Sequence, residues 1–244
     1  MEFSWQILVL AALVSLVGSF VQSTTGFGYA VTVMAVWPIF LPFKTAVVAE
    51  TATALFMSAA IALRYRRYIV WRQLLWPAAS SFVMNGVGVL LLDHISEHGL
   101  RRMLGVVLVA LAVWFIFFSD RIHIRPTTLN GLAAGAVSGL TGGLCSIGGP
   151  PIVAYYINAF EDKREYTATT QMFFIISVLW LLILHTVRGN LDLAVIEVSA
   201  VSLIGLAAGT AAGMALFKKL PMAAIKKLVY GFMLAMGIYT VITG

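Results

Sequence analysis

The chain begins with an uncharged stretch that is too long to be one membrane helix. From Phe3 to Phe43 there are 41 residues without Asp, Glu, Lys or Arg. At about 1.5 Å per residue, one helix of this length would be about twice as long as the bilayer's hydrocarbon core is thick. The stretch must therefore fold back, and the turn signal is the Gly-containing segment 22–28. A second uncharged stretch, 126–160, has a similar Gly-rich segment at 141–151.

The composition places the whole chain in a lipid bilayer. Of the 244 residues, 61% are hydrophobic and only 11% are charged, whereas a soluble domain has about 25% charged residues. This excludes a water-soluble enzyme, a nucleic-acid-binding protein and a disordered chain. The net charge of +6 comes from basic residues in short loops, where they set membrane orientation rather than bind nucleic acid. Helices of single-span length are expected at residues 44–63, 73–92, 103–119, 166–184, 198–217 and 228–244.

The two halves of the chain resemble each other. The segment 100–104 (Leu-Arg-Arg-Met-Leu) matches 225–229 (Ile-Lys-Lys-Leu-Val) at an offset of 125, and Gly88 matches Gly213 at the same offset. Each half also has a long apolar stretch with a Gly-rich break, followed by a helix with a polar cluster. We expect an all-α polytopic membrane protein with two repeats, 1–122 and 123–244. Each repeat would have a broken-helix or hairpin element plus three transmembrane helices.

Loop charges predict that the two repeats are inverted in the membrane. In the inverted arrangement four basic residues lie on one side, namely Lys44, Arg101, Arg102 and Arg188. The other twelve lie on the opposite side, namely Arg64, Arg66, Arg67, Arg72, Arg121, Arg125, Lys163, Arg164, Lys218, Lys219, Lys226 and Lys227. A parallel arrangement would divide them almost equally. The positive-inside rule favours the inverted one, with both chain ends outside.

The two Gly-rich breaks are the leading candidates for a binding site. Substrates of inverted-repeat transporters bind where broken helices from the two repeats meet. Helices starting near Gly26 and Gly149 would direct amide groups and positive dipole ends toward a ligand. Neutral hydroxyl and amide donors without Lys or Arg describe a site for a small anion that is bound and released. The expected substrate-binding residues are Gln22, Ser23, Thr24, Thr25, Gly26, Gly28, Thr51, Thr141, Gly143, Cys145, Ser146, Gly148, Gly149, Thr170 and Gln171.

Glu50 is the one acidic residue well inside an apolar helix of the first half. Ionisable groups inside a membrane are costly and therefore indicate function. Glu50 is our candidate for carrying a coupling proton, although its charge could instead bind a cation. A position near the lipid headgroups is the structural alternative, because Lys44 is six residues away.

The residues at the two breaks resemble those of the TauE/SafE family of sulfite exporters. The first break reads Gly18-x3-Gln-Ser-Thr-Thr-Gly-Phe-Gly28 and is followed by Trp37-Pro38. The second reads Gly139-Leu-Thr-Gly-Gly-Leu-Cys-Ser-Ile-Gly-Gly-Pro-Pro151. The resemblance implies a secondary transporter of small sulfur-containing anions, such as sulfite or an organosulfonate, coupled to an ion gradient. The first break has more hydroxyl side chains and fewer glycines than several family members, which indicates an anion other than sulfite.

Other functions are weighed against this one. The alternatives are a transporter or channel for another small anion, such as a carboxylate, and an intramembrane enzyme using Ser146 or Cys145 with His185. We expect no enzyme, because no third orienting group or nucleophile motif accompanies these residues. We also expect no cofactor and no metal, since one cysteine cannot form a multi-thiolate site. The chain has no phosphate-binding loop for ATP.

The expected partners follow from this assignment. They are a small anionic substrate and the lipid bilayer, with no nucleic acid. A coupling ion, either a proton or sodium, and a second copy of the chain in a homodimer are open as further partners. The expected location is a cell membrane, crossed several times, most simply the cytoplasmic membrane of a bacterium.

Overall fold

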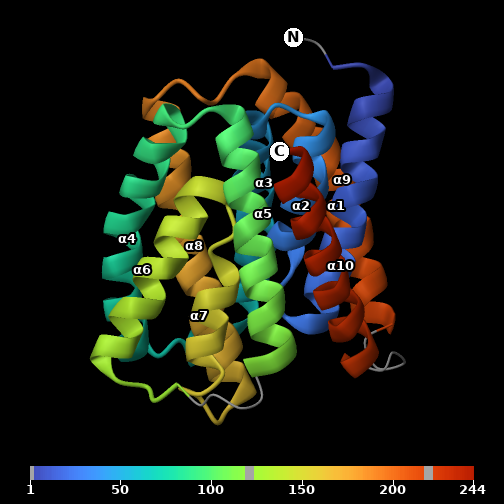
Figure 1. Cartoon of the computed structure of the whole chain (residues 1–244). Coiled ribbons are helices and arrows are strands. Elements are labelled where there is room, and N and C mark those ends of the chain that lie inside the picture. Colours follow the sequence, from blue (N-terminus) through green and yellow to red (C-terminus); the bar gives the residue numbers. More distant parts are fainter. Residues whose placement is uncertain (1–2, 119–123, 217–221) are drawn as a thin grey trace.

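The chain folds into one bundle of helices (Figure 1). The computed structural model describes residues 3–118, 124–216 and 222–244, and these residues form helices and connecting loops without a β-strand. In chain order the helices are α1 (Trp5–Thr25), α2 (Tyr29–Phe40), α3 (Phe43–Tyr65), η1 (Arg66–Tyr68), α4 (Trp71–His94), α5 (Glu97–Val113), η2 (Trp114–Phe118), α6 (Thr128–Cys145), α7 (Gly149–Tyr156), α8 (Lys163–Val187), α9 (Leu193–Leu216) and α10 (Met222–Thr243). The expected all-α fold is confirmed.

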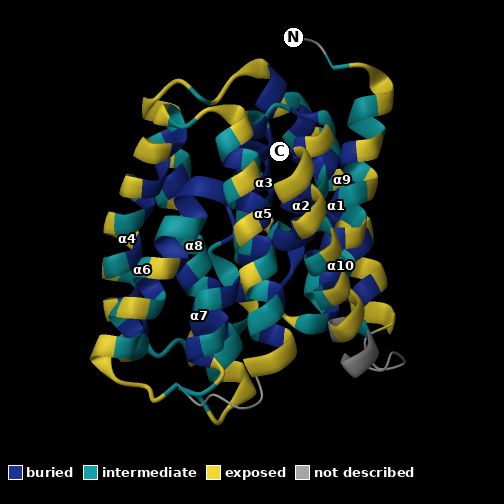
Figure 2. Ribbon diagram, viewed as in Figure 1, coloured by how far each residue is buried: buried dark blue, intermediate teal, exposed yellow. Residues whose placement is uncertain are grey.

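Six helices in the described residues are long and apolar enough to cross a membrane. They are α1, α3, α4, α5, α8 and α9, and among them α3 continues into η1 and α5 into η2. The helices α2 and α10 provide shorter apolar segments. Large apolar side chains cover the outside of the bundle, including Leu129, Val187, Ile204 and Leu228, each more than 70% exposed. Figure 2 shows the exposed residues on the outward faces of the helices. Such a surface is stable against lipid but not against water, so the chain is a multi-pass membrane protein.

Both long uncharged stretches are broken where glycine was expected to break them. The first forms α1 and α2, which are separated by residues 26–28. The second forms α6 and α7, which are separated by residues 146–148. One detail differs from the expected segment 22–28, because Gln22 to Thr25 still belong to α1. The hydroxyls of Ser23, Thr24 and Thr25 donate to carbonyl oxygens of the preceding turn. The helix therefore ends only where Gly26 adopts a left-handed conformation.

The two halves of the chain exchange helices at their packing contacts. The helix α1 packs along α9, and its counterpart α6 packs along α4, while α3 packs on α8 and α5 on α10. Glycine permits the close approach in both exchanged pairs. A Cβ at Gly205 of α9 would meet the carbonyl oxygen of Ala12 in α1. A Cβ at Gly139 of α6 would lie 2.5 Å from the carbonyl oxygen of Ser81 in α4.

The first helices of the two predicted repeats run in opposite directions through the bundle (Figure 1). The helix α1 begins at the end of the bundle where the chain also finishes, and α6 begins at the opposite end (Figure 1). Three of the residues predicted for the basic side, Arg121, Lys218 and Lys219, lie outside the described residues, as does the predicted repeat boundary at 122–123.

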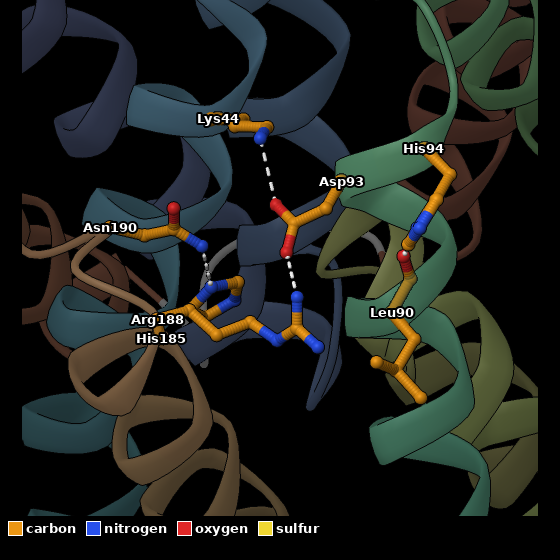
Figure 3. A network of polar contacts seen from close by, with 7 residues as sticks. All are labelled: Lys44, Leu90, Asp93, His94, His185, Arg188 and Asn190. Atoms are coloured by element: carbon orange, nitrogen blue, oxygen red, sulfur yellow. Dashed lines mark hydrogen bonds and ion pairs between the residues drawn. The ribbon is translucent and has the colours of Figure 1, made fainter.

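One end of the bundle is held together by Asp93, the penultimate residue of α4. Its carboxylate accepts from Lys44 Nζ at 2.7 Å and forms a second ion pair with Arg188. Figure 3 shows Asp93 lying between these two side chains, with His185 and Asn190 beside Arg188. Lys44 is the second residue of α3, and Arg188 follows α8 directly. We name this the Asp93 end of the bundle. Here Asp93 links the start of α3 to the end of α8.

Candidate functional site

A cavity of about 70 Å³ lies between the two helix breaks. Its wall comes from α1 and α2 of the first break, α6 and α7 of the second, and the central helices α3 and α8. On α3 the lining positions are 50, 54 and 58, and on α8 they fall between 173 and 181, so the cavity lies near the middle of both helices. The polar side chains and small residues of the wall are Gln22, Gly28, Tyr29, Glu50, Ser58, Ser138, Gly142, Ser146, Gly148, Gly149 and Ser177.

The first break is shaped by two glycines with left-handed backbone. Gly26 has φ 86° and ends α1 by donating its N–H to the carbonyl oxygen of Gln22 at 2.8 Å. Gly28 has φ 115° and precedes α2, a conformation that side chains other than glycine rarely adopt. The side-chain oxygen of Gln22 accepts from the N–H of Tyr29 at 3.0 Å. Since the first four N–H groups of a helix lack partners within it, the remaining amides at the start of α2 are available beside the cavity.

The second break uses a serine where the first uses a glycine. Ser146 has φ 57°, the one positive φ outside glycine in the described residues. Its N–H donates to the carbonyl oxygen of Gly142 at 2.8 Å and ends α6. Ser138 Oγ donates to the carbonyl oxygen of Gly148 at 2.5 Å, which fixes the segment before α7. A left-handed non-glycine residue is strained, and such strain is concentrated at functional sites.

The start of α7 offers fewer donors than the sequence suggested. Pro150 and Pro151 follow Gly149 in its first turn, and proline has no N–H. We expected both breaks to direct backbone N–H groups at a ligand, but the second break supplies fewer of them than the first. The amides come mainly from α2, and the second break contributes the side chain of Ser146, which contacts Glu50 and Thr51.

Among the described residues of the cavity wall, Glu50 is the only Asp, Glu, Lys or Arg. It is 2% exposed, and none of the ion pairs formed by the described residues includes it. Ser146 Oγ is hydrogen-bonded to its Oε2 atom, whereas its Oε1 atom is buried without a hydrogen-bond partner among the described residues. Ser146 Oγ also lies 2.8 Å from Thr51 Oγ1. The structure thus joins Glu50 of α3 to the second break, away from the headgroup position considered as its alternative.

The opposite wall of the cavity comes from α8 and is mainly apolar. Phe173, Phe174, Val178 and Leu181 face it together with Ser177. Asn85 Nδ2 donates to Ser177 Oγ at 2.8 Å. Because Asn85 provides the hydrogen in this bond, the Ser177 hydroxyl retains its own hydrogen for a ligand.

The structure brings six of the sixteen predicted site residues to the cavity wall. These six are Gln22, Gly28, Glu50, Ser146, Gly148 and Gly149. Thr51 reaches the wall indirectly through its contact with Ser146. The other nine do not line the cavity, and they are Ser23, Thr24, Thr25, Gly26, Thr141, Gly143, Cys145, Thr170 and Gln171.

The nine residues away from the wall have other surroundings. The hydroxyls of Ser23, Thr24 and Thr141 donate to carbonyl oxygens of their own helices, and that of Thr25 also reaches the carbonyl of Phe27. A Cβ at Gly143 would lie 2.5 Å from the carbonyl oxygen of Asn85, so this glycine serves helix packing. In α8, Thr170 Oγ1 and Gln171 Oε1 are buried without partners among the described residues, and their contact with substrate stays a prediction.

Several residues of the cavity wall were not among those predicted from the sequence. Ser58 lies two turns after Glu50 on α3, and Ser138 lies two turns before Ser146 on α6, with Ala54 and Gly142 between them. Positions four apart lie on one face of a helix, so this spacing could have identified them. Ser177 had a weaker signal, because the predicted site residue seven positions before it on α8, Thr170, does not itself line the cavity.

The geometry does not assemble the dyad considered for an intramembrane enzyme. Ser146 is bonded to Glu50 and Thr51. His185 lies at the Asp93 end, where its Nδ1 atom is 3.2 Å from Asn190 Nδ2, and it does not line the cavity. The site therefore offers neutral donors, aromatic walls and one carboxyl group.

Comparison with known proteins agrees with the resemblance at the helix breaks. The model of the family described as sulfite exporter TauE/SafE matches residues 10–240, nearly the whole chain and both breaks. No match was found to a curated protein or to a solved structure. The long family match, the membrane-spanning helices and the paired breaks lead to one assignment: the chain belongs to the sulfite exporter TauE/SafE family of membrane transporters.

Proposed function

We propose that the protein is a secondary transporter that moves small sulfur-containing anions across the cytoplasmic membrane of a bacterium, driven by an ion gradient. The observation that carries this proposal is the meeting of both helix breaks at one cavity in the middle of α3 and α8. Broken helices at mid-membrane are where secondary transporters bind their substrates. Backbone that is not helical is stable in a membrane only when it faces protein or a wet cavity.

The size and chemistry of the cavity support a small anion. A single buried water needs about 10–15 Å³, so about 70 Å³ suits a small oxyanion with a few waters and is too small for a lipid. The donors are the amides at the start of α2 and the hydroxyl of Ser177. Neutral donors bind an anion without holding it as an ion pair would, which favours release. The choice of a sulfur-containing anion rests on the family.

The paired packing supports alternating access by two inverted repeats. The helices α1 and α6 start at opposite ends of the bundle (Figure 1), and each packs on the fourth α-helix of the other half, α1 on α9 and α6 on α4. In this arrangement one repeat can tilt against the other and expose the cavity to each side in turn. The basic residues near Arg66 and Lys163 would then face the cytoplasm, and the Asp93 end would face outside.

Flux measurements in proteoliposomes test the proposed function. Purified protein is reconstituted, and uptake of radiolabelled sulfite and of a small sulfonate is measured with sulfate, thiosulfate, acetate and nitrate as competitors. We expect saturable uptake that is accelerated by the same anion inside the vesicles and is inhibited by sulfur-containing anions alone. Inhibition by acetate instead would assign a carboxylate transporter. Flux without acceleration by internal anion would assign a channel.

A further inference from the structure

A chain of hydrogen bonds links Glu50 to the backbone of its own helix through the second break. Glu50 Oε2 is bonded to Ser146 Oγ, and Ser146 Oγ lies 2.8 Å from Thr51 Oγ1. Thr51 Oγ1 in turn lies 2.8 Å from the carbonyl oxygen of Val47. All three side chains are buried. The chain therefore has three contacts between four oxygen atoms.

The hydrogens available for these contacts depend on the charge of Glu50. A hydroxyl has one hydrogen, so Ser146 and Thr51 together supply two, and the Val47 carbonyl supplies none. If Glu50 is ionised, Ser146 donates to it, Thr51 must donate to Ser146, and the contact between Thr51 and Val47 has no hydrogen. If Glu50 is protonated, it donates to Ser146, Ser146 donates to Thr51, and Thr51 donates to Val47. Only the protonated form satisfies all three contacts.

From this count of hydrogens we infer that Glu50 is a neutral carboxylic acid in this structure, and that its proton is the ion transported together with the anion. The inference rests on the proposed function for its second half, while the first half stands on the hydrogen bonds alone. It names the coupling ion of the same cavity, which the sequence left open between a proton and sodium.

The surroundings of Glu50 contain no charge that would stabilise a carboxylate. Tyr29 of α2 is the other titratable group that the described residues place on the cavity wall, and Cys145 of α6 directly precedes Ser146. Both are ordinarily neutral at pH 7. Tyr29 is committed to Thr53 Oγ1 at 2.8 Å and Ser15 Oγ at 2.9 Å. The wall that α8 presents is formed by Phe174, Ser177, Val178 and Leu181. An unpaired buried charge is costly, and protonation removes it.

Binding of the anion and of the proton must then favour each other. An anion that enters a cavity lined by a carboxylate meets a like charge in a medium that screens it weakly. The same anion beside neutral Glu50 meets no repulsion. Loss of one proton from Glu50 therefore opposes binding of one anion, and the two are transported in the same direction with one proton for each anion.

Sodium is the competing choice and fits the contacts less well. A cation at Glu50 would need oxygen ligands with free lone pairs pointing at it. The hydroxyls of Ser146 and Thr51 are instead bonded to each other and to their neighbours. The measurements below separate the two ions.

The first test reads the charge of Glu50 without any substrate. Infrared difference spectra of the protein in lipid detect the C=O band of a protonated carboxylic acid. We expect this band at neutral pH in the wild type and in Glu197→Gln, an acid of α9 outside the cavity, and we expect its loss in Glu50→Gln. Retention of the band in Glu50→Gln would show that Glu50 is ionised and would overturn the inference.

The second test reads coupling in proteoliposomes loaded with a pH-sensitive dye. A small sulfonate is the substrate, because unlike sulfite it carries no titratable proton near neutral pH. We expect the sulfonate to drive proton entry in the wild type and Glu197→Gln. In Glu50→Gln, where the amide replaces the neutral acid, exchange of labelled sulfonate persists but proton entry is lost. The apparent affinity of the wild type should fall about tenfold for each pH unit over which Glu50 loses its proton, and that of Glu50→Gln should not change.

Failures of the two proposals are distinguishable. If the wild type neither binds nor moves sulfur-containing anions while the infrared band is lost in Glu50→Gln, the proposed function fails and the protonated state of Glu50 stands. If sulfonate is transported but proton entry persists in Glu50→Gln, or a sodium gradient drives uptake at constant pH, the assignment of Glu50 as the proton carrier is wrong.

Discussion

Gly26 and Ser146 occupy equivalent places in the two helix breaks, each ending the long helix with left-handed backbone at φ 86° and 57°. Glycine adopts this conformation at no steric cost, whereas serine is strained by about 1–2 kcal/mol. At the second break the serine contributes a hydroxyl that contacts Glu50 and Thr51. The strain is therefore tolerated where a side chain is needed.

Two substitutions of Ser146 separate the strain from the hydroxyl. Both Ser146→Ala and Ser146→Gly remove the contacts with Glu50 and Thr51, and we expect both to weaken anion binding equally. Only Ser146→Gly removes the strain, so it should be more stable than Ser146→Ala by roughly 0.5–1 kcal/mol, once glycine's greater conformational entropy is subtracted. Unfolding in one detergent and anion-induced melting shifts measure these effects. Equal stability of the two variants would argue against strain at this position.

Two glycines of α4 provide a matched test of the packing between α4 and α6. A Cβ at Gly88 would lie 2.8 Å from Gly143 Cα, whereas a Cβ at Gly86 would meet nothing within 4 Å. We expect Gly88→Ala to destabilise the protein by about 1–3 kcal/mol through overpacking. Gly86→Ala should stabilise it by up to about 1 kcal/mol through helix propensity. Thermal unfolding of both variants checks the prediction, which fails if Gly88→Ala is as stable as the wild type.

Asp93 is expected to keep the cavity closed at its end of the bundle. It joins Lys44 at the start of α3 to Arg188 after α8 (Figure 3), and these helices line opposite sides of the cavity. Asp93→Asn removes the charge of both pairs. Since a partly exposed pair typically contributes about 0.5 kcal/mol, loss of both pairs costs about 1 kcal/mol, and the open state should become about fivefold more populated.

Thiol labelling measures this opening. The single cysteine is first replaced in Cys145→Ala, and a reporter on the cavity wall is introduced as Leu181→Cys. An impermeant maleimide should label the reporter about fivefold faster in Asp93→Asn. Arg101→Gln is the control, because it breaks the ion pair with Glu97 at the same end without touching α8. Equal labelling rates in the two variants would show that Asp93 does not hold the cavity closed.

The sequence predicted the framework of the site but not its full wall, for a physical reason. The breaks were predictable because an uncharged stretch twice the bilayer thickness must turn, and it turns within the Gly-rich segments, at Gly26 in the first and at Ser146 in the second. The rotation of each helix was not predictable, because lipid and protein interior are both apolar and leave little periodicity to read. Ser177 was missed for this reason. Thr24 and Thr141 were candidates by proximity to the breaks, yet their hydroxyls bond to their own helices.

The similarity between the two halves likewise left most of the helix packing unpredicted. The similarity of 100–104 to 225–229 predicts two related halves, and this stays a prediction. The helices that contain these segments, α5 and α10, pack on each other. The first helix of each half packs on the fourth helix of the other half. Neither half alone predicts this packing, because glycines such as Gly139 and Gly205 contact residues about 55 to more than 190 positions away in the chain.

The central claim is that a small sulfur-containing anion binds between the two breaks, and a cavity-filling substitution tests it most directly. Ala54→Leu adds volume to the cavity wall of α3, whereas Ala52→Leu changes the same residue type on the same helix away from the wall. At about 100 times its dissociation constant, a bound anion stabilises the folded protein by about 2.7 kcal/mol. We predict that sulfite or a small sulfonate raises the melting temperature of the wild type and Ala52→Leu but not that of Ala54→Leu, with acetate and nitrate inactive. An equal rise in Ala54→Leu would place the anion elsewhere and contradict the account.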